Sequence, residues 1–244
     1  MTIKDLTSQD DSRQYQKSLN PFHNIPFKKL EASIELIKRK FSRDDQKLQL
    51  SALVDAFNKY YIANIPVDYW FRDMNDFNGS KALSRRYEAM TEDIELSYAE
   101  GLKSCFAGSH GVGKTYTCAC ILKRVAESGK YNALYVNLTD IINVLLSENK
   151  EVGRRLLLER DFLVIDEFDS RFMGTSNSAD LFGRIIEPVI RTRIQNRLPL
   201  LICTNSPDLT EGFSGPLQAS IKSLMKVVKL TPALGKDYRG EIDE

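Results

Sequence analysis

The feature that most constrains the fold of this chain is the stretch "GSHGVGKT", from Gly108 to Thr115. Its spacing, G-x-x-x-x-G-K-[ST], is that of a phosphate-binding loop between a strand and a helix. The glycines let the backbone curl so that successive N–H groups point at phosphate oxygens. The ammonium of Lys114 can then reach the β- and γ-phosphates, and the hydroxyl of Thr115 can ligate Mg²⁺. The residues expected to bind the nucleotide are Gly108, Ser109, His110, Gly111, Val112, Gly113, Lys114, Thr115 and Tyr116.

The residues on both sides of the loop support this interpretation. The stretch "LKSCFAG" before it is short and apolar enough to be a strand, and a helix is predicted from about Lys114 to Glu127. Ser128 and Gly129 then provide a stop signal for that helix. The alternative is a chance match in a turn of small residues. Average composition makes such a match in a chain of this length an event on the order of one in a hundred.

Composition and charge restrict the class of protein. The chain has 244 residues, 42% of them hydrophobic and 27% charged, which suits a globular protein with a substantial core. The formal net charge is +1, so any binding of nucleic acid would have to come from a local patch. We find neither an apolar run of transmembrane length nor a signal-peptide pattern, and we expect a cytoplasmic protein with no membrane contact. Cys118 and Cys120 are too close in sequence for a zinc-binding pair, so the four cysteines are expected to be buried free thiols.

Two amphipathic helices are predicted ahead of the loop. Apolar residues recur at steps of three and four over residues 27–41 and again over residues 45–61. We interpret residues 1–61 as a small α-helical N-terminal module that binds a partner, with its first dozen residues disordered, and residues 62–244 as a second domain. The basic residues of the first helix are either a solvated helix surface or a binding patch.

From residue 62 onward, predicted strands alternate with predicted helices. The five expected strands are Leu102–Phe106, Ala133–Val136, Phe162–Asp166, Leu198–Thr204 and Val227–Leu230. This alternation is typical of an α/β fold in which helices flank both faces of a parallel five-stranded sheet.

An acid pair ends one of these strands, in the stretch "DFLVIDEFD". Because ligands bind at the carboxyl ends of parallel strands, both acids should face the nucleotide. Asp166 is placed to hold Mg²⁺, and Glu167 is placed to orient and deprotonate an attacking water. The alternative for Glu167 is an ordinary surface acid at a strand end. A phosphoryl-transferring kinase is the least favoured class, because it would leave Glu167 without a role.

Two further signals follow the acid pair. "LPLLICTNSPDL" is a buried strand that ends at Asn205, which is either a holder of water or γ-phosphate, or an ordinary turn residue. Arg191, Arg193 and Arg197 crowd the end of the helix before that strand. They are either favourably placed at a helix C-terminus or include an arginine finger that reaches a neighbouring subunit's nucleotide.

At this point the sequence resembles a family, the AAA+ ATPases that load replicative helicases, of the DnaC/DnaI type, with IstB-like transposition helpers as relatives. The likeness covers roughly residues 62 to 244 and is clearest from Phe106 to Asn205. It rests on "GSHGVGKT", "FLVIDEFD", "LFGRIIEPVIRTRIQNRLP" and "LLICTNS". The first two stretches are generic to AAA+ proteins, whereas the adjoining last two are more particular to the loaders.

The resemblance implies an AAA+ fold, with ATP and Mg²⁺ as cofactors, and it assigns roles to residues of this chain. The family's Walker A residues fall on Lys114 and Thr115, its Walker B pair on Asp166 and Glu167, its first sensor on Asn205 and its finger on Arg193. It also implies three partners. These are a replicative hexameric DNA helicase held by the N-terminal helices, single-stranded DNA, and further copies of the chain in a ring or spiral, expected to be a hexamer.

The sequence departs from the family pattern in two places. No arginine lies between Arg197 and Arg239, so the second sensor of the family would be Lys222, Lys226 or no residue at all. Residues 1–61 also lack the zinc-binding cysteines of the DnaI type. A transposition helper with the same ATPase core therefore stays open as an alternative function, as does a nucleotide-dependent switch with little turnover.

By the same resemblance, single-stranded DNA would contact the helix predicted between the second strand and the acid-bearing strand. Its end carries four basic residues, Lys150, Arg154, Arg155 and Arg160. The alternative is an exposed helix on which Glu148, Glu151 and Glu159 pair with these bases.

Overall fold

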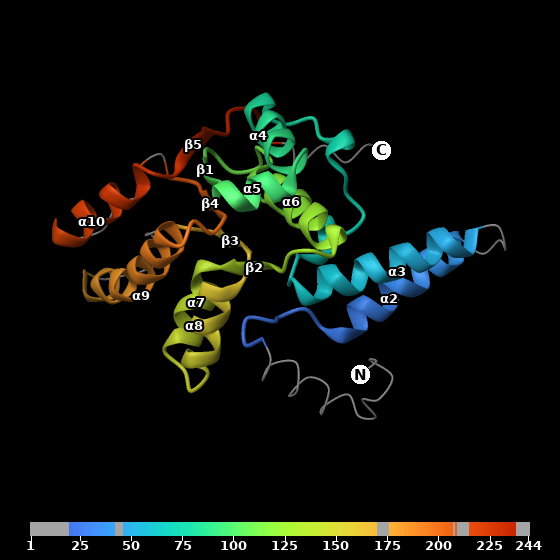
Figure 1. Ribbon diagram of the computed structural model, residues 1–244, viewed down its shortest axis with the longest axis horizontal. Coiled ribbons are helices and arrows are strands. Elements are labelled where there is room, and N and C mark those ends of the chain that lie inside the picture. The colour runs from blue at the N-terminus through green and yellow to red at the C-terminus, as the bar shows by residue number, and fades with distance from the viewer. Residues whose placement is uncertain (1–19, 42–45, 170–175, 207, 209–214, 238–244) are drawn as a thin grey trace.

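The computed structural model describes residues 20–41, 46–169, 176–206, 208 and 215–237. The first dozen residues, for which we predict disorder, lie outside this part of the chain. The described residues form a central sheet with helices on both faces and a helical arm that extends to one side (Figure 1).

The sheet has five strands in the order β2-β3-β4-β1-β5, and every neighbouring pair is parallel. The strands are β1 (Lys103–Ala107), β2 (Ala133–Asn137), β3 (Phe162–Asp166), β4 (Leu200–Thr204) and β5 (Lys229–Pro232). The predicted α/β class and five-stranded parallel sheet are therefore confirmed. The last strand begins two residues later than predicted, because the N–H groups of Val227 and Val228 still bond to Leu224 and Met225 at the end of the preceding helix.

Helices cover both faces of this sheet (Figure 1). On one face lie α4 (Lys81–Thr91), α5 (Ile94–Glu100) and α6 (Lys114–Ser128). On the other lie α7 (Leu138–Leu145), α8 (Lys150–Glu159) and α9 (Ser176–Gln195), with α10 (Gly215–Met225) packed against α9. The near-continuous apolar strands β1 to β4 follow from this arrangement, since each strand is buried on both sides.

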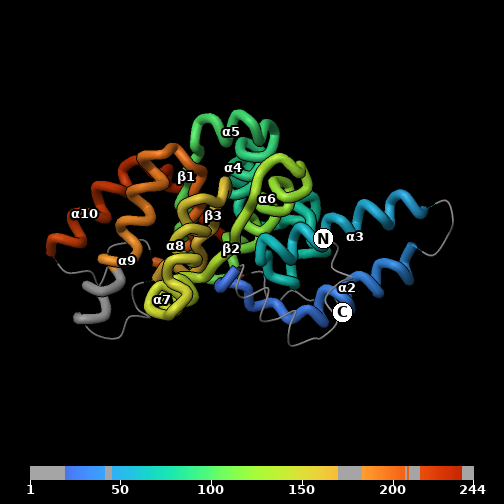
Figure 2. The backbone as a smooth tube through the Cα atoms, turned by 60° about the horizontal axis from the view of Figure 1, so that its bottom comes forward, coloured from blue at the N-terminus to red at the C-terminus, as the bar shows by residue number. Residues whose placement is uncertain are grey.

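Two helices, α2 (Phe27–Lys40) and α3 (Lys47–Ile62), form an arm that extends away from the sheet in two views (Figures 1 and 2). Both helices were predicted from their apolar spacing. The last turns of α3 reach the main core, where Phe57, Tyr60 and Tyr61 are buried in one cluster with α6 and β2. The base of the arm is thus packed into the core beside the sheet.

The segment after β2 differs from the single helix that we predicted. It forms two helices, α7 and α8, which are separated at residues 146–149. The hydroxyl of Ser147 donates to the carbonyl of Val144 and accepts from the N–H of Asn149, which closes a turn between them. The helix α9, by contrast, is not interrupted, although it contains a proline at position 188.

All four cysteines are buried free thiols, as predicted. Among the helices of the described residues, we find none with the length and apolar character needed to cross a membrane.

Candidate nucleotide-binding site

A cavity of about 550 Å³ lies at the carboxyl ends of β1, β3 and β4. Residues that the sequence singles out line it together, namely His110, Gly111, Gly113, Lys114, Thr115, Tyr116, Asp166, Glu167 and Asn205. They come from the phosphate-binding loop, the acid-bearing strand and the following strand, which are far apart in the sequence. The parallel order of the strands brings them to one place.

The loop has the conformation that its glycines allow. Gly111 and Gly113 have positive φ angles of 74° and 96°, which few residues other than glycine adopt. A side chain at Gly111 would also meet the carboxylate of Asp237, whose Oδ1 would lie 1.7 Å from an added Cβ. The carboxylate of Asp237 thus lies against the loop backbone at Gly111.

Lys114 begins α6, and its side chain folds back onto the loop. Its Nζ donates to the carbonyls of Gly108, at 2.9 Å, and Ser109, at 2.6 Å. These bonds hold a largely buried ammonium beside the loop, where phosphate oxygens would lie. The N-terminus of α6 points at the same place and favours negative charge there.

The oxygens of Thr115 and Asp166 form the part of the cavity suited to a metal ion. Thr115 Oγ1 donates to Asp166 Oδ2 at 2.7 Å, and the N–H of Glu167 donates to Asp166 Oδ1 at 2.7 Å. A hydroxyl and a buried carboxylate are hard oxygen ligands of the kind that Mg²⁺ prefers. Because the phosphate-binding loop is adjacent to the oxygens of Thr115 and Asp166, these residues fit Mg²⁺ bound together with a nucleoside triphosphate.

Glu167 follows Asp166 in the chain and has a strained backbone conformation. Its φ is 52°, which is rare for a residue with a side chain and indicates that the surrounding structure imposes it. Glu167 lines the cavity next to Asp166. Partial desolvation raises the pKa of Glu167, and the nearby carboxylates of Asp166 and Asp140 raise this pKa further. Such a shift favours a general base, since it strengthens the affinity of the carboxylate for a proton.

One wall of the cavity comes from residues that sequence reasoning missed. Two short 3₁₀ helices, η3 (Val67–Tyr69) and η4 (Met74–Asp76), run past the loop, and Tyr69, Arg72 and Phe77 line the cavity. The rings of Tyr69 and Phe77 pack against the ring of Tyr116. The centroid of the Tyr116 ring lies 5.2 Å from that of Phe77 and 5.9 Å from that of Tyr69. The dense aromatic stretch "DYWFRDMNDF" is the signal that would have pointed to this wall. An aromatic surface beside a phosphate loop suits a nucleobase.

Arg193 contradicts its assigned role as an arginine finger. Its side chain is 0% exposed, and its guanidinium donates to four backbone carbonyls at 2.7–3.0 Å. The acceptors are Leu157, Arg160, Asp161 and Pro199. They lie around the amino ends of β3 and β4, at the opposite edge from the cavity. Arg193 therefore holds the sheet to α8 and α9, and it is not available to a neighbouring subunit.

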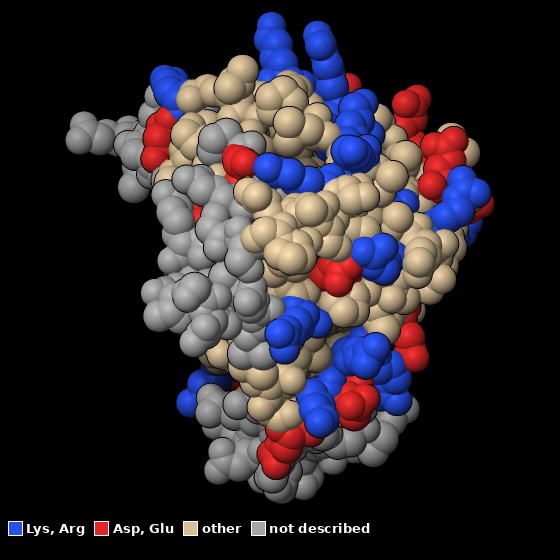
Figure 3. Space-filling model, turned by 90° about the vertical axis from the view of Figure 1, so that its left-hand side faces the viewer, with Lys and Arg blue, Asp and Glu red and all other residues tan. Residues whose placement is uncertain are grey.

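The four basic residues predicted after β2 do not form one group. Arg160 is the C-cap of α8, and its carbonyl accepts from Arg193. Lys150 and Arg154 line a cavity of about 310 Å³ between α8 and α9, together with Arg184, which sequence reasoning missed. Arg155 instead forms an ion pair with Glu159, with 3.9 Å between Nε and Oε2. Acidic and basic side chains are interspersed over the side of the molecule that carries α9 and α10 (Figure 3). Glu151 lines the same cavity, so the three bases share it with one acid.

Comparison with known proteins agrees with this geometry. Residues 104–212 match the family described as "ATPase family associated with various cellular activities (AAA)". This span runs from β1 past Asn205 and includes Lys114, Thr115, Asp166, Glu167 and Asn205 of the cavity. No curated protein matches the chain.

Solved structures share the fold at low sequence identity. The crystal structure of DnaI is 18% identical with a TM-score of 0.55, over 71% of this chain and 94% of that one. The crystal structure of the DnaC helicase loader is 20% identical with a TM-score of 0.53, over 68% of this chain and 99% of that one. The replication initiator DnaA, bound to AMPPCP and single-stranded DNA, is 15% identical with a TM-score of 0.56, over 70% of this chain and 51% of that one.

Proposed function

We propose that this chain, which contains an AAA ATPase domain, uses ATP to load a replicative DNA helicase onto single-stranded DNA. The observation that carries the proposal is the single cavity that joins Lys114, the oxygen pair of Thr115 and Asp166, and the carboxylate of Glu167. Two solved structures that share the fold, DnaI and the DnaC helicase loader, favour a helicase as the protein that is remodelled.

The residues of the cavity divide the chemistry of ATP hydrolysis among them. The loop backbone and Lys114 bind and orient the phosphates, and Thr115 and Asp166 would hold Mg²⁺. The metal ion would neutralise charge on the phosphate oxygens. Glu167 is placed to take a proton from water as the water oxygen attacks the γ-phosphorus and the bond to the ADP oxygen breaks. Asn205 lines the same cavity and would hold the water or the γ-phosphate.

We further propose that the chain acts as a ring or spiral of several copies, a hexamer by its resemblance. With Arg193 buried, Arg191 is the next candidate for a cation that acts across the subunit contact. Its side chain is exposed on α9, where it is bonded to Glu187 of the same helix and to Ser220 of α10. It therefore lies on the surface that α9 and α10 share. That surface is the proposed contact between copies.

The arm is the proposed helicase-binding element. It projects from the ATPase core, and its apolar residues Leu36 and Leu48 are 44% and 87% exposed. We expect a tagged chain, with ATP present, to retain a purified hexameric replicative helicase. Changing Leu36 and Leu48 to serine should abolish this retention, whereas Leu96→Ser, at a 52% exposed position on α5, should not. Retention of a transposase in place of the helicase would contradict the proposal and favour a transposition helper.

Single-stranded DNA is proposed to bind along Lys150, Arg154 and Arg184. Each lost phosphate contact should flatten the slope of log affinity against log salt by roughly 0.7, because fewer counterions are released. We expect Arg154→Ala to weaken DNA binding and to flatten this slope, measured by fluorescence anisotropy with ATP bound. Arg155→Ala is the matched control and should change neither quantity, since Arg155 is paired with Glu159. Equal effects of both substitutions would contradict a site at this cavity.

A further inference from the structure

A buried tyrosine on β2 shares the metal-binding carboxylate with Thr115. The hydroxyl of Tyr135 lies 2.5 Å from Asp166 Oδ2, and Thr115 Oγ1 lies 2.7 Å from the same oxygen. An ionised carboxylate only accepts hydrogen bonds, so both hydroxyls donate. Asp166 Oδ1 is held separately by the N–H of Glu167. Three donors thus fix the orientation of one carboxylate.

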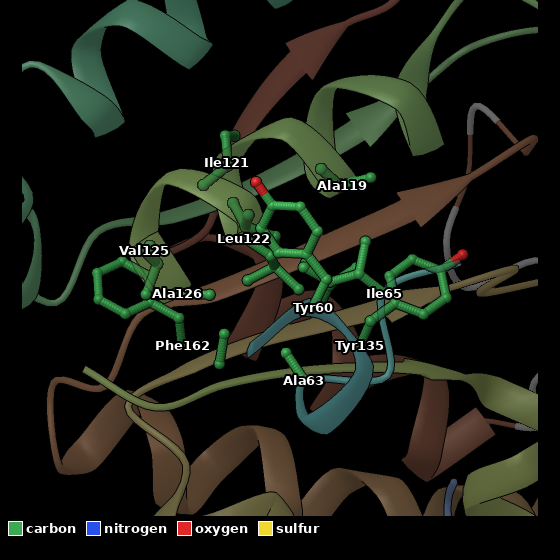
Figure 4. Close-up of a cluster of buried hydrophobic side chains, with 14 of the residues drawn as sticks. Tyr60, Ala63, Ile65, Ala119, Ile121, Leu122, Val125, Ala126, Tyr135 and Phe162 are labelled. Carbon is green, nitrogen blue, oxygen red and sulfur yellow. The ribbon is translucent and has the colours of Figure 1, made fainter. Parts of the chain in front are cut away.

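Tyr135 is a buried donor to Asp166. The residue is 6% exposed, and its hydroxyl donates to Asp166 Oδ2 from within the core. Figure 4 shows its ring at the edge of the apolar cluster, with the hydroxyl directed away from the other labelled side chains. When Thr115 turns its hydroxyl toward a metal ion, Tyr135 would remain to hold Asp166 in place.

The backbone of Tyr135 is bonded to the end of the arm. Its N–H donates to the carbonyl of Ala63 at 2.9 Å, and its carbonyl accepts from Asn64 Nδ2 at 3.0 Å. These two residues directly follow α3. Asn64 is itself fixed, since it has a φ of 57° and its Nδ2 also donates to the carbonyl of Phe22. The turn at the base of the arm is therefore attached to the outer edge of β2 at the residue whose hydroxyl reaches Asp166.

We propose that Tyr135 is a positioning residue that orients Asp166 for Mg²⁺ and connects the base of the arm to the metal site. The inference rests on the proposed function, because it assigns Asp166 to the metal of an ATPase. A partner that shifts the turn at Ala63 and Asn64 would move Tyr135 and change the affinity of the site for Mg²⁺. Binding at the arm and events at the nucleotide are then linked through Tyr135, whose backbone is bonded to Ala63 and Asn64 and whose hydroxyl is bonded to Asp166.

The first test is Tyr135→Phe, which keeps the ring and removes only the hydroxyl. Partners that orient a metal ligand typically contribute 10- to 100-fold in metal affinity or activity. We expect the Mg²⁺ concentration that half-saturates nucleotide binding to rise about 10-fold, while the affinity for nucleotide without Mg²⁺ stays unchanged. Tyr60→Phe is the matched control, because Tyr60 is buried in the same cluster but donates to Glu127, outside the site. It should leave the Mg²⁺ dependence as it is.

The second test addresses the connection to the arm. Asn64→Gly keeps a residue that tolerates a positive φ but removes the amide that holds Tyr135 and Phe22. It should raise the half-saturating Mg²⁺ concentration in the same direction as Tyr135→Phe. Arg197→Gly, at another positive-φ position (54°) shortly before the amino end of β4, should not.

The outcomes separate this inference from the proposed function. An unchanged Mg²⁺ dependence in Tyr135→Phe, in a protein that binds nucleotide like the parent, would overturn the role of Tyr135 alone. An effect of Tyr135→Phe without any effect of Asn64→Gly would overturn the connection to the arm. Because the measured quantity is binding, the role of Tyr135 is tested even in a protein that does not hydrolyse ATP, and failure to hydrolyse counts against the proposed function instead.

Discussion

Glu167→Gln is expected to lower the rate of ATP hydrolysis by about 10²- to 10⁴-fold while ATP binding is retained. The amide has the shape of the carboxylate but cannot accept the proton of the attacking water. The loop, Lys114, Thr115 and Asp166 are untouched, so nucleotide and Mg²⁺ should still bind. Phosphate release and the affinity for a fluorescent ATP analogue, measured on the same preparation, separate the two effects.

Two controls sharpen this result. Glu159→Gln, at an exposed position on α8, should leave hydrolysis unchanged. The rate of ATP hydrolysis by the parent should rise with pH as Glu167 loses its proton. Because the pKa of Glu167 is raised, this rise should be centred above the ordinary pKa of glutamate, about 4.3. The rise should be absent in Glu167→Gln. A variant that hydrolyses ATP at the parental rate would show that another group is the base.

Arg193→Ala is expected to destabilise the fold by roughly 3–5 kcal/mol, because four backbone carbonyls lose a buried charged donor. Arg193→Lys should also be destabilising, since a single ammonium cannot span the four acceptors of the planar guanidinium. Urea denaturation followed by circular dichroism gives the free energy of unfolding for each variant.

Exposed arginines close to Arg193 provide matched controls. Arg191→Ala and Arg197→Ala should change the free energy of unfolding by about 0.5 kcal/mol or less. An arginine finger predicts the opposite pattern for Arg193→Ala. The protein would be as stable as the parent, would assemble, and would regain activity when mixed with Lys114→Ala protein. That pattern would contradict the structural role assigned to Arg193.

The sequence was sufficient for the features that local patterns determine. The glycine spacing of the loop, the apolar strands and the helices of the arm each depend on residues close together in the chain, and the structure has them within a few residues of the predicted bounds. The meeting of Lys114, Asp166 and Asn205 followed from one further rule, that parallel strands present their carboxyl ends at one edge.

The features that were missed depend on contacts between distant segments. The bond from Tyr135 to Asp166 has no local pattern that specifies it. The wall at Tyr69 and Phe77 had one signal, the density of aromatic residues in "DYWFRDMNDF", but that stretch does not specify that it packs beside the phosphate-binding loop. The position of Arg193 also had a signal. It lies three and seven residues after the buried Ile190 and Ile186, so it continues the apolar face of α9. A charged residue on such a face is buried when backbone carbonyls surround it.

The central claim is that one cavity binds ATP with Mg²⁺ and hydrolyses it. The most direct measurement is phosphate release by the purified chain over a range of protein concentrations, with and without Mg²⁺, beside Lys114→Ala protein. The account predicts Mg²⁺-dependent release whose specific activity rises with protein concentration, as shared sites require, and no release from Lys114→Ala. ATP binding without measurable release at any concentration, with or without single-stranded DNA, would contradict it and would identify a nucleotide-dependent switch.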